Sequence, residues 1–160
     1  MCWIVRVYAL ISDHAGRYLV LEEYFQGSWI TKFPGGGVEP CEGLTEALQR
    51  ELKEELGTSA ASYQLFYVND FYQRSYYHEN ARLLSVYYTV DLADVPQALG
   101  PRTKLRWLLP DFMALTFPVD RRVRRLLMER SRGVHPQTVP SSAGPSGYLP
   151  RLADDLKQHE

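Results

Sequence analysis

Three glutamates, Glu51, Glu54 and Glu55, lie within five residues near the middle of the chain. Leucines that recur every fourth residue through the same segment predict a helix. At about 100° per residue, Glu51 and Glu55 lie within about 40° of each other and Glu54 about 60° further round, so the three share one flank. Like charges at these spacings repel, and Mg²⁺ reverses that balance because it takes oxygen ligands. The cluster therefore indicates divalent-metal chemistry on an anionic substrate.

The cluster belongs to a longer pattern. The segment from Gly36 to Thr58 resembles the box of the Nudix hydrolase (MutT-like) family, which runs Gly, five residues, Glu, seven residues, Arg-Glu, an aliphatic, any residue, Glu-Glu, any residue, Gly and an aliphatic. Thr58 replaces the final aliphatic, a change that we expect to affect packing rather than chemistry. The matching positions are Gly36, Glu42, Arg50, Glu51, Leu52, Glu54, Glu55 and Gly57.

The resemblance implies an α/β fold, an α/β/α sandwich around a mixed β-sheet. It also implies hydrolysis of a phosphoanhydride in a nucleoside diphosphate linked to a further group, by water attack at phosphorus. The implied cofactor is Mg²⁺, or Mn²⁺, held by Glu51, Glu54, Glu55 and the Gly35 carbonyl. Catalysis would use the same three glutamates with Arg50. Gly36, Glu42 and Gly57 would support the site. The competing interpretation is a surface helix with i, i+4 ion pairs such as Arg50–Glu54.

Five further residues are candidates for substrate contact, and each has a plain alternative. Asp120 could read a base, although we favour a role in the first turn of a helix. Tyr76 could stack on a base or sugar. Arg102 and Lys104 could meet phosphates or form a solvated basic face. Some Nudix hydrolases use another acid before the strand that holds Trp107; residues 100–106 contain none, so Glu79 is a replacement candidate or an exposed loop acid.

Three functions therefore compete. The leading one is a metal-dependent pyrophosphohydrolase of a nucleoside triphosphate or related nucleotide. The second is a hydrolase of a dinucleoside polyphosphate or nucleotide sugar. The third is a non-catalytic nucleotide sensor, which loss of box glutamates would favour; here all of them are present.

Composition limits the other classes of protein. A chain of 160 residues is long enough for one domain with a real core. A net charge of −1 argues against a broad nucleic-acid-binding surface, and no apolar run reaches membrane-spanning length. Cys2 and Cys41 form no disulfide framework, which suits the cytoplasm. We expect a nucleotide as the partner, no nucleic acid or membrane, and a homodimer on grounds of the resemblance alone.

The elements that must position these residues follow from residue patterns. Residues 3–11 and 18–24 predict a β-hairpin, because β-formers flank the turn at 12–16. A loop at 26–28 leads to the glycine-rich segment and the box helix. Residues 1–130 then form a Nudix domain. The composition of residues 131–160, rich in Pro, Gly and Ser, predicts a disordered or extended tail, with docking on the domain or on a partner as the alternative. The remaining predicted elements are strands at 63–68, 83–91 and 105–109 and a helix at 118–130.

Overall fold

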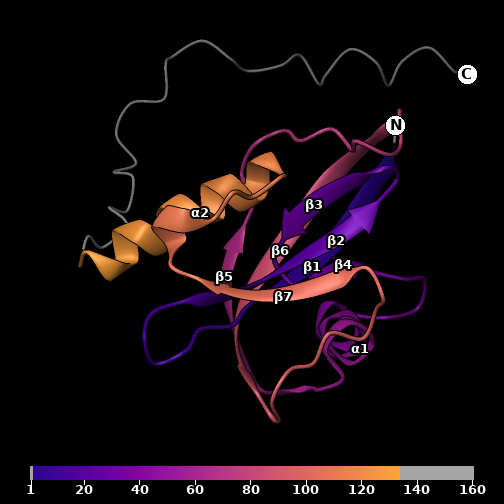
Figure 1. Ribbon diagram of the computed structural model, residues 1–160. Helices are drawn as coiled ribbons and strands as arrows, with labels where there is room; N and C mark the ends of the chain where they lie inside the picture. Colours follow the sequence, from indigo (N-terminus) through magenta and orange to yellow (C-terminus); the bar gives the residue numbers. More distant parts are fainter. Residues whose placement is uncertain (1, 134–160) are drawn as a thin grey trace, which may run out of the picture.

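The structure is a computed structural model that describes residues 2–133 (Figure 1). Seven strands, two α-helices and one short 3-10 helix make up this part of the chain. Neither α-helix is long and apolar enough to span a membrane. In chain order the elements are β1 (Cys2–Leu10), β2 (Tyr18–Phe25), β3 (Ser28–Lys32), β4 (Gly35–Gly37), α1 (Leu44–Leu56), β5 (Ala60–Val68), β6 (Ala81–Leu92), β7 (Thr103–Leu108), η1 (Pro110–Phe112) and α2 (Pro118–Ser131).

The strands form two sheets. The larger is mixed and has the order β4-β1-β6-β5, in which β1 and β6 run parallel and the two outer pairs run antiparallel. The smaller sheet has the order β3-β2-β7 and is antiparallel throughout. Strand β4 holds Gly35 and Gly36 at the edge of the mixed sheet, against β1, and α1 follows it directly in the chain.

Alternation along the strands divides the core into two clusters, because successive side chains of a strand point to opposite faces. On one face, Val7 and Ala9 of β1 pack with the buried leucines of α1. On the other face, Tyr8 and Leu10 pack with Val119, Val123 and Leu127 of α2. Figure 1 shows the two helices on opposite sides of the strands. The predicted α/β/α sandwich around a mixed sheet is confirmed.

The predicted opening hairpin is wrong. β1 pairs with β4 and β6, whereas β2 pairs with β3 and β7. The turn between β1 and β2 does form, with the Asp13 N–H donating to the Arg17 carbonyl, but only a single bridge, Ser12 to Tyr18, joins its two sides. The chain uses this turn to pass from one sheet to the other.

The other predicted elements are present with shifted ends. Strands β5 and β6 begin at residues 60 and 81 rather than 63 and 83, and α2 ends one residue later than predicted. Strand β3 was not predicted, because residues 26–28 were assigned to a loop that led on to Trp29. Of the predicted tail at 131–160, Ser131 is the last residue of α2, and residues 134–160 lie outside the described residues.

Candidate active site

Helix α1 carries the three glutamates and has a defined beginning and end. At its start, the Glu46 carboxylate accepts a hydrogen bond of 2.7 Å from the Gly43 N–H. At its end, Gly57 adopts a left-handed conformation with φ of 68° and donates its N–H to the Lys53 carbonyl. Glycine is the residue that tolerates this conformation best. The helix therefore ends at Leu56, one residue after Glu55.

Two glycines of β4 lie where a side chain would not fit, Gly35 against the backbone of β1 and Gly36 against α1. A Cβ on Gly35 would lie 2.1 Å from the Val7 carbonyl oxygen, and Gly35 has a φ of 134° that side chains rarely adopt. A Cβ on Gly36 would lie 2.2 Å from a carboxylate oxygen of Glu51. Gly37, by contrast, has open space around it. Gly36 therefore provides the room in which the Glu51 carboxylate lies.

The Glu55 carboxylate is hydrogen-bonded by the last residue of β3 and the first residue of β4. Its Oε2 accepts a 2.7 Å hydrogen bond from the Gly35 N–H, and its Oε1 accepts one of 2.6 Å from the Lys32 ammonium. Lys32 also donates to the Gly35 carbonyl oxygen at 2.8 Å. Burial raises the pKa of Glu55, against the opposing effect of Lys32. Burial lowers the pKa of Lys32, but Glu55 and Glu23 outweigh it, so that pKa lies above its usual value.

Arg50 connects α1 to the segment before it. Its guanidinium bonds both oxygens of Glu42, at 2.5 and 3.1 Å, and the Gly37 carbonyl oxygen at 2.8 Å. It also reaches Glu51 at 3.0 Å and Glu54 at 3.3 Å. The hydrogen bond to Glu42 is the main reason that the pKa of Arg50 lies above its ordinary value. Charge-assisted bonds of this kind are strong, so Arg50 fixes the loop before the helix as well as the glutamates.

The three glutamates differ in exposure. The side chains of Glu51 and Glu55 are 13% and 15% exposed, whereas that of Glu54 is 58% exposed. Within residues 2–133, no three His, Cys, Asp or Glu side chains converge on one point in the way that a metal site requires. The donor chemistry nevertheless fits a hard cation, since a positive group, the Lys32 ammonium, already lies on Glu55 and the Gly35 carbonyl.

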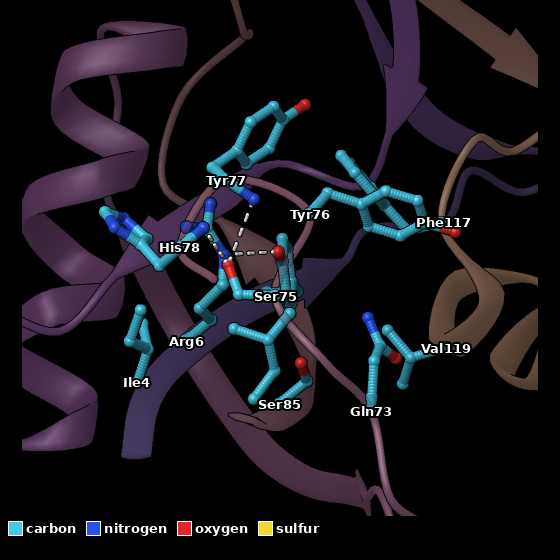
Figure 2. Close-up of a pocket in the computed structure, with 12 residues that line it drawn as sticks. Ile4, Arg6, Gln73, Ser75, Tyr76, Tyr77, His78, Ser85, Phe117 and Val119 are labelled. Atoms are coloured by element: carbon cyan, nitrogen blue, oxygen red, sulfur yellow. Dashed lines mark hydrogen bonds between the residues drawn. The ribbon is translucent and has the colours of Figure 1, made fainter. Parts of the chain in front are cut away.

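A pocket opens on the α2 face of the mixed sheet, between β1, β6, the loop after β5 and the start of α2 (Figure 2). Arg6 of β1 donates its Nε–H to the Tyr8 hydroxyl at 2.7 Å. Gln73 is buried, and neither atom of its amide has a hydrogen-bond partner among the described residues. The pocket contains aromatic, hydroxyl and cationic side chains, and its twelve lining residues are Ile4, Arg6, Tyr8, Gln73, Ser75, Tyr76, Tyr77, His78, Leu83, Ser85, Phe117 and Val119.

Asp120 lies next to Val119 of this pocket but is fully buried. Its Oδ1 accepts a 2.5 Å hydrogen bond from the Tyr87 hydroxyl, and its Oδ2 has no partner among the described residues. Burial raises the pKa of Asp120 to about 7, despite opposing effects from Tyr87, Lys32 and Arg6. Asp120 is in the first turn of α2, yet it caps nothing: the N-cap is Phe117 and no side chain caps this helix. The expected place of Asp120 in the first turn of a helix is confirmed, whereas a capping hydrogen bond is absent.

Of the remaining residues that the sequence suggested for substrate contact, only Tyr76 lines the pocket. Tyr76 does line the pocket, with its ring centroid 5.9 Å from that of Phe117. Arg102 lies over the Tyr24 ring and Lys104 over the Trp29 ring, and neither lines the pocket. Glu79 is an exposed loop residue whose backbone carbonyl accepts a bond from Arg74.

Three residues that the sequence interpretation missed occupy central positions: Lys32, Arg6 and Gln73. Two of them left a signal in the sequence. Lys32 follows Ile30 at the alternate position of a strand, and Arg6 lies between Ile4 and Tyr8 in the same way, so both place a charge on an inward-facing side. Gln73 left none, because it lies in an irregular loop.

Comparison with known proteins is consistent with this arrangement. A family model described as "NUDIX domain" matches residues 3–131. The CTP pyrophosphohydrolase of Escherichia coli K12 is 32% identical over 139 residues, which cover 70% of this chain and 93% of that protein. The RNA pyrophosphohydrolase of Pasteurella multocida is 34% identical over 65 residues, and this match spans 41% of the chain but only 32% of that relative.

Among solved structures, the solution structure of the E. coli ORF135 protein matches with a TM-score of 0.68 and 26% identity. The match covers 86% of this chain and 96% of that one. The fold, the arrangement around α1 and the family match therefore agree with one another. The chain belongs to the NUDIX family, and it is a Nudix hydrolase.

Proposed function

We propose that this enzyme is a pyrophosphohydrolase of nucleoside triphosphates. In the reaction, a water oxygen forms a new bond to phosphorus, an anhydride P–O bond breaks, and pyrophosphate and a nucleoside monophosphate leave. The observation that supports this most is the position of Arg6. It lines the pocket, yet its strand position pairs with Gly37 of the glycine-rich edge. A nucleoside in the pocket would therefore direct its phosphates toward α1.

Electrostatics support the same orientation of the substrate. Burial lowers the pKa of Arg6, but its contact with Tyr8 and the charges of Glu51 and Asp120 outweigh burial and raise it. Arg6 therefore stays positive between a carboxylate of α1 and one beside the pocket. With its Nε engaged by Tyr8, its two terminal NH₂ groups have no protein acceptor in the described part of the chain. Such a fork suits a phosphate.

The proposed cofactor is Mg²⁺, with Mn²⁺ as the alternative, because all the candidate donors are oxygens. Glu55, the Gly35 carbonyl, Glu51 and Glu54 would hold it. When bound, such a cation neutralises phosphate charge and lowers the pKa of bound water. Arg50 would position Glu51 and Glu54, and burial of Glu51 beside Gly36 would place its carboxylate to accept a proton from the attacking water.

The aromatic wall of the pocket supports the nucleoside part of the proposal. Tyr76 and Phe117 form a tilted ring pair at the pocket, and bases stack well on such side chains. The Tyr76 ring is largely exposed. It could also stack a second base, which is the observation in favour of dinucleoside polyphosphates as the alternative substrate. Both relatives described above are named as pyrophosphohydrolases, one of CTP and one of RNA.

The proposal also covers the cellular location and the oligomeric state of the enzyme. Cys2 and Cys41 are exposed and unpaired within the described residues, which supports a reducing, cytoplasmic environment. A homodimer rests on the resemblance to the family alone. A nucleotide sensor without activity has little support, because Arg50 and the three glutamates of α1 are all in place.

The test is turnover of a substrate panel with Mg²⁺: nucleoside triphosphates, including oxidised ones, dinucleoside polyphosphates and nucleotide sugars. Products are separated so that pyrophosphate release is distinguished from loss of a single phosphate. The double variant Glu54→Gln, Glu55→Gln should abolish turnover, whereas Glu79→Gln, an exposed loop change, should leave it unaltered. Thermal melting confirms that each variant is folded. Binding of nucleotides without any turnover by the wild-type enzyme would refute the proposal in favour of the sensor.

A further inference from the structure

Lys32 is a buried cation in direct contact with the glycine-rich edge. Its side chain is only 6% exposed, and its ammonium lies 2.6 Å from Glu55 Oε1 and 2.8 Å from the Gly35 carbonyl oxygen. A third acceptor, Glu23 Oε1, lies 3.8 Å away. Lysine is almost never fully buried unless it is paired, so these acceptors account for its position.

The strand register explains why Lys32 points inward. Lys32 is the last residue of β3 and pairs with Leu21 of β2, whose side chain is fully buried in the core on the α1 side. Glu23 lies two residues further along β2, on the same face and at a diagonal to Lys32. The Lys32 side chain therefore runs beneath the sheet toward α1, between an acid of β2 and one of α1.

The two strongest contacts of Lys32 are the two groups that would also receive a divalent cation. Glu55 Oε2 is engaged by the Gly35 N–H, so Oε1 is the oxygen left to face a cation, and Lys32 occupies it. The Gly35 carbonyl is the other expected donor, and Lys32 occupies that too. An ammonium and a dication on the same two oxygens would lie close together and repel each other, so binding of the cation at this edge favours the departure of Lys32.

We propose that Lys32 is a resident placeholder for the divalent cation: its ammonium keeps Glu55 and the Gly35 carbonyl oriented while the cation is absent, and cation binding displaces it toward Glu23. This inference rests on the metal dependence in the proposed function. The placeholder removes the cost of leaving Glu55 buried and unpaired in the free enzyme. Glu23 is partly exposed and already within 4 Å, so the displaced ammonium needs only a change of side-chain rotamer to reach it.

The test follows the Lys32 ammonium directly, without turnover. In ¹⁵N-labelled wild-type protein at low temperature, a buried and hydrogen-bonded lysine NH₃⁺ gives a slowly exchanging signal. The Lys32→Met variant assigns this signal by its absence. Mg²⁺ is then added alone, and backbone amide shifts of Gly35 to Gly37 report its binding. We expect the Lys32 signal to move or vanish in step with those amide shifts.

A second measurement compares Mg²⁺ affinity by calorimetry. Removing the competing ammonium should tighten Mg²⁺ binding to Lys32→Met by about tenfold or more, and Mg²⁺ should raise the melting temperature of this variant more than that of the wild type. Lys53→Met is the matched control. It removes a positive charge from an exposed position of α1 that is next to the same glutamates in the sequence but on another side of the helix, and its side chain makes no ion pair among those described. The control should show a much smaller change.

Each outcome decides one question. Mg²⁺ binding with an unchanged Lys32 signal overturns the placeholder, and so does the absence of Mg²⁺ binding at this edge. Equal Mg²⁺ affinity of Lys32→Met and Lys53→Met also overturns it. If Lys32→Met does not fold, nuclear Overhauser contacts between the ammonium and the backbone amide of Gly35 assign the wild-type signal instead, and its response to Mg²⁺ decides. Turnover with an undisplaced Lys32 would leave the proposed function standing, whereas displacement without turnover on any substrate would refute the function and retain the placeholder.

Discussion

At the scale of single residues, this site is notable for polar groups that are buried with too few partners. An unpartnered buried amide or carboxyl costs about 1 to 3 kcal/mol, and the protein gains nothing in the free state to offset that cost. Gln73 and Asp120 both carry such atoms beside the pocket. Gln73 lines the pocket, so we expect a bound ligand to supply hydrogen bonds to its amide and this residue to favour binding at a cost in stability.

The first prediction concerns Gln73→Leu. Leucine is similar in size and needs no hydrogen bond, so we expect the free enzyme to gain about 1 kcal/mol of unfolding free energy. We expect nucleotide KM to rise severalfold, with kcat changed less. Urea denaturation and steady-state kinetics measure the two effects. Gln64→Leu, on the exposed face of β5, should change neither the unfolding free energy nor the nucleotide KM. A destabilised Gln73→Leu would mean that the amide has a structural role instead.

The second prediction concerns Asp120 and pH. The pKa of Asp120 is raised to about 7 in the folded state, whereas an unfolded Asp titrates near 3.9. Between these values the unfolded chain loses its proton while the folded protein keeps it, so stability falls as pH rises from about 4 to 7 and then levels off. The effect is on the order of a few kcal/mol. The groups that face it are Tyr87, Lys32, Arg6 and Arg121.

Asp120→Asn removes this titration. The unfolding free energy of the variant should therefore fall less between pH 5 and pH 8 than that of the wild type. Denaturation at the two pH values measures the difference between variant and wild type. Asp94→Asn, an exposed change, should keep the wild-type pH dependence. If Asp120→Asn declined as steeply as the wild type, Asp120 would be ionised in the folded protein at pH 5.

The residues of α1 were predictable because they share one helix, where spacing along the chain fixes direction in space. The partners of Glu55 were not. Lys32 lies 23 residues away on a strand, and nothing in its spacing from the box indicates the contact. The place of Asp120 in the first turn of a helix was predictable, but its burial against Tyr87 was not, because that contact depends on another strand.

At the scale of elements, the close approach of α1 to β4 depends on glycine. Gly36→Ala would place a Cβ within 2.2 to 2.7 Å of the Glu51 carboxylate, so the carboxylate or the helix must move. Overpacking of this kind costs typically about 1 to 3 kcal/mol, and we expect turnover to fall by at least about tenfold because Glu51 is displaced. Melting temperature and kcat measure the two losses.

The adjacent glycine provides the control for this third prediction. Gly37 belongs to the same strand, has ordinary backbone geometry and would meet nothing within 4 Å of an added Cβ. Gly37→Ala should therefore keep turnover and stability close to those of the wild type. Equal losses in the two variants would show that strand flexibility, rather than the contact with Glu51, is the important property.

Element types were more predictable than their pairing. Alternation and β-formers located β1 and β2, but such patterns say nothing about partners. The two strands therefore suggested a hairpin that the structure lacks. Strand β3 was missed because it has five residues and follows a Gly-containing turn, where a loop fits equally well.

At the scale of the whole molecule, all the residues to which the proposed function assigns a role lie within residues 2–133. Both core clusters, the glycine-rich edge and the pocket lie within them, and the family match ends at residue 131. The division into a Nudix domain and a tail remains a prediction. It is consistent with α2 closing the second core before the change in composition begins.

The fourth prediction follows from that division. A chain that ends at residue 133 should fold, melt within about 2 °C of the full chain and keep its kcat/KM, because it loses no side chain of either core cluster. A chain that ends at residue 117 should not fold, since it lacks the buried face of α2 (Val119, Val123 and Leu127) and leaves Tyr87 without Asp120. Calorimetry and turnover compare the three lengths. A clear loss in the 133-residue chain would assign a docked role to residues 134–160, the alternative that the composition of the tail leaves open.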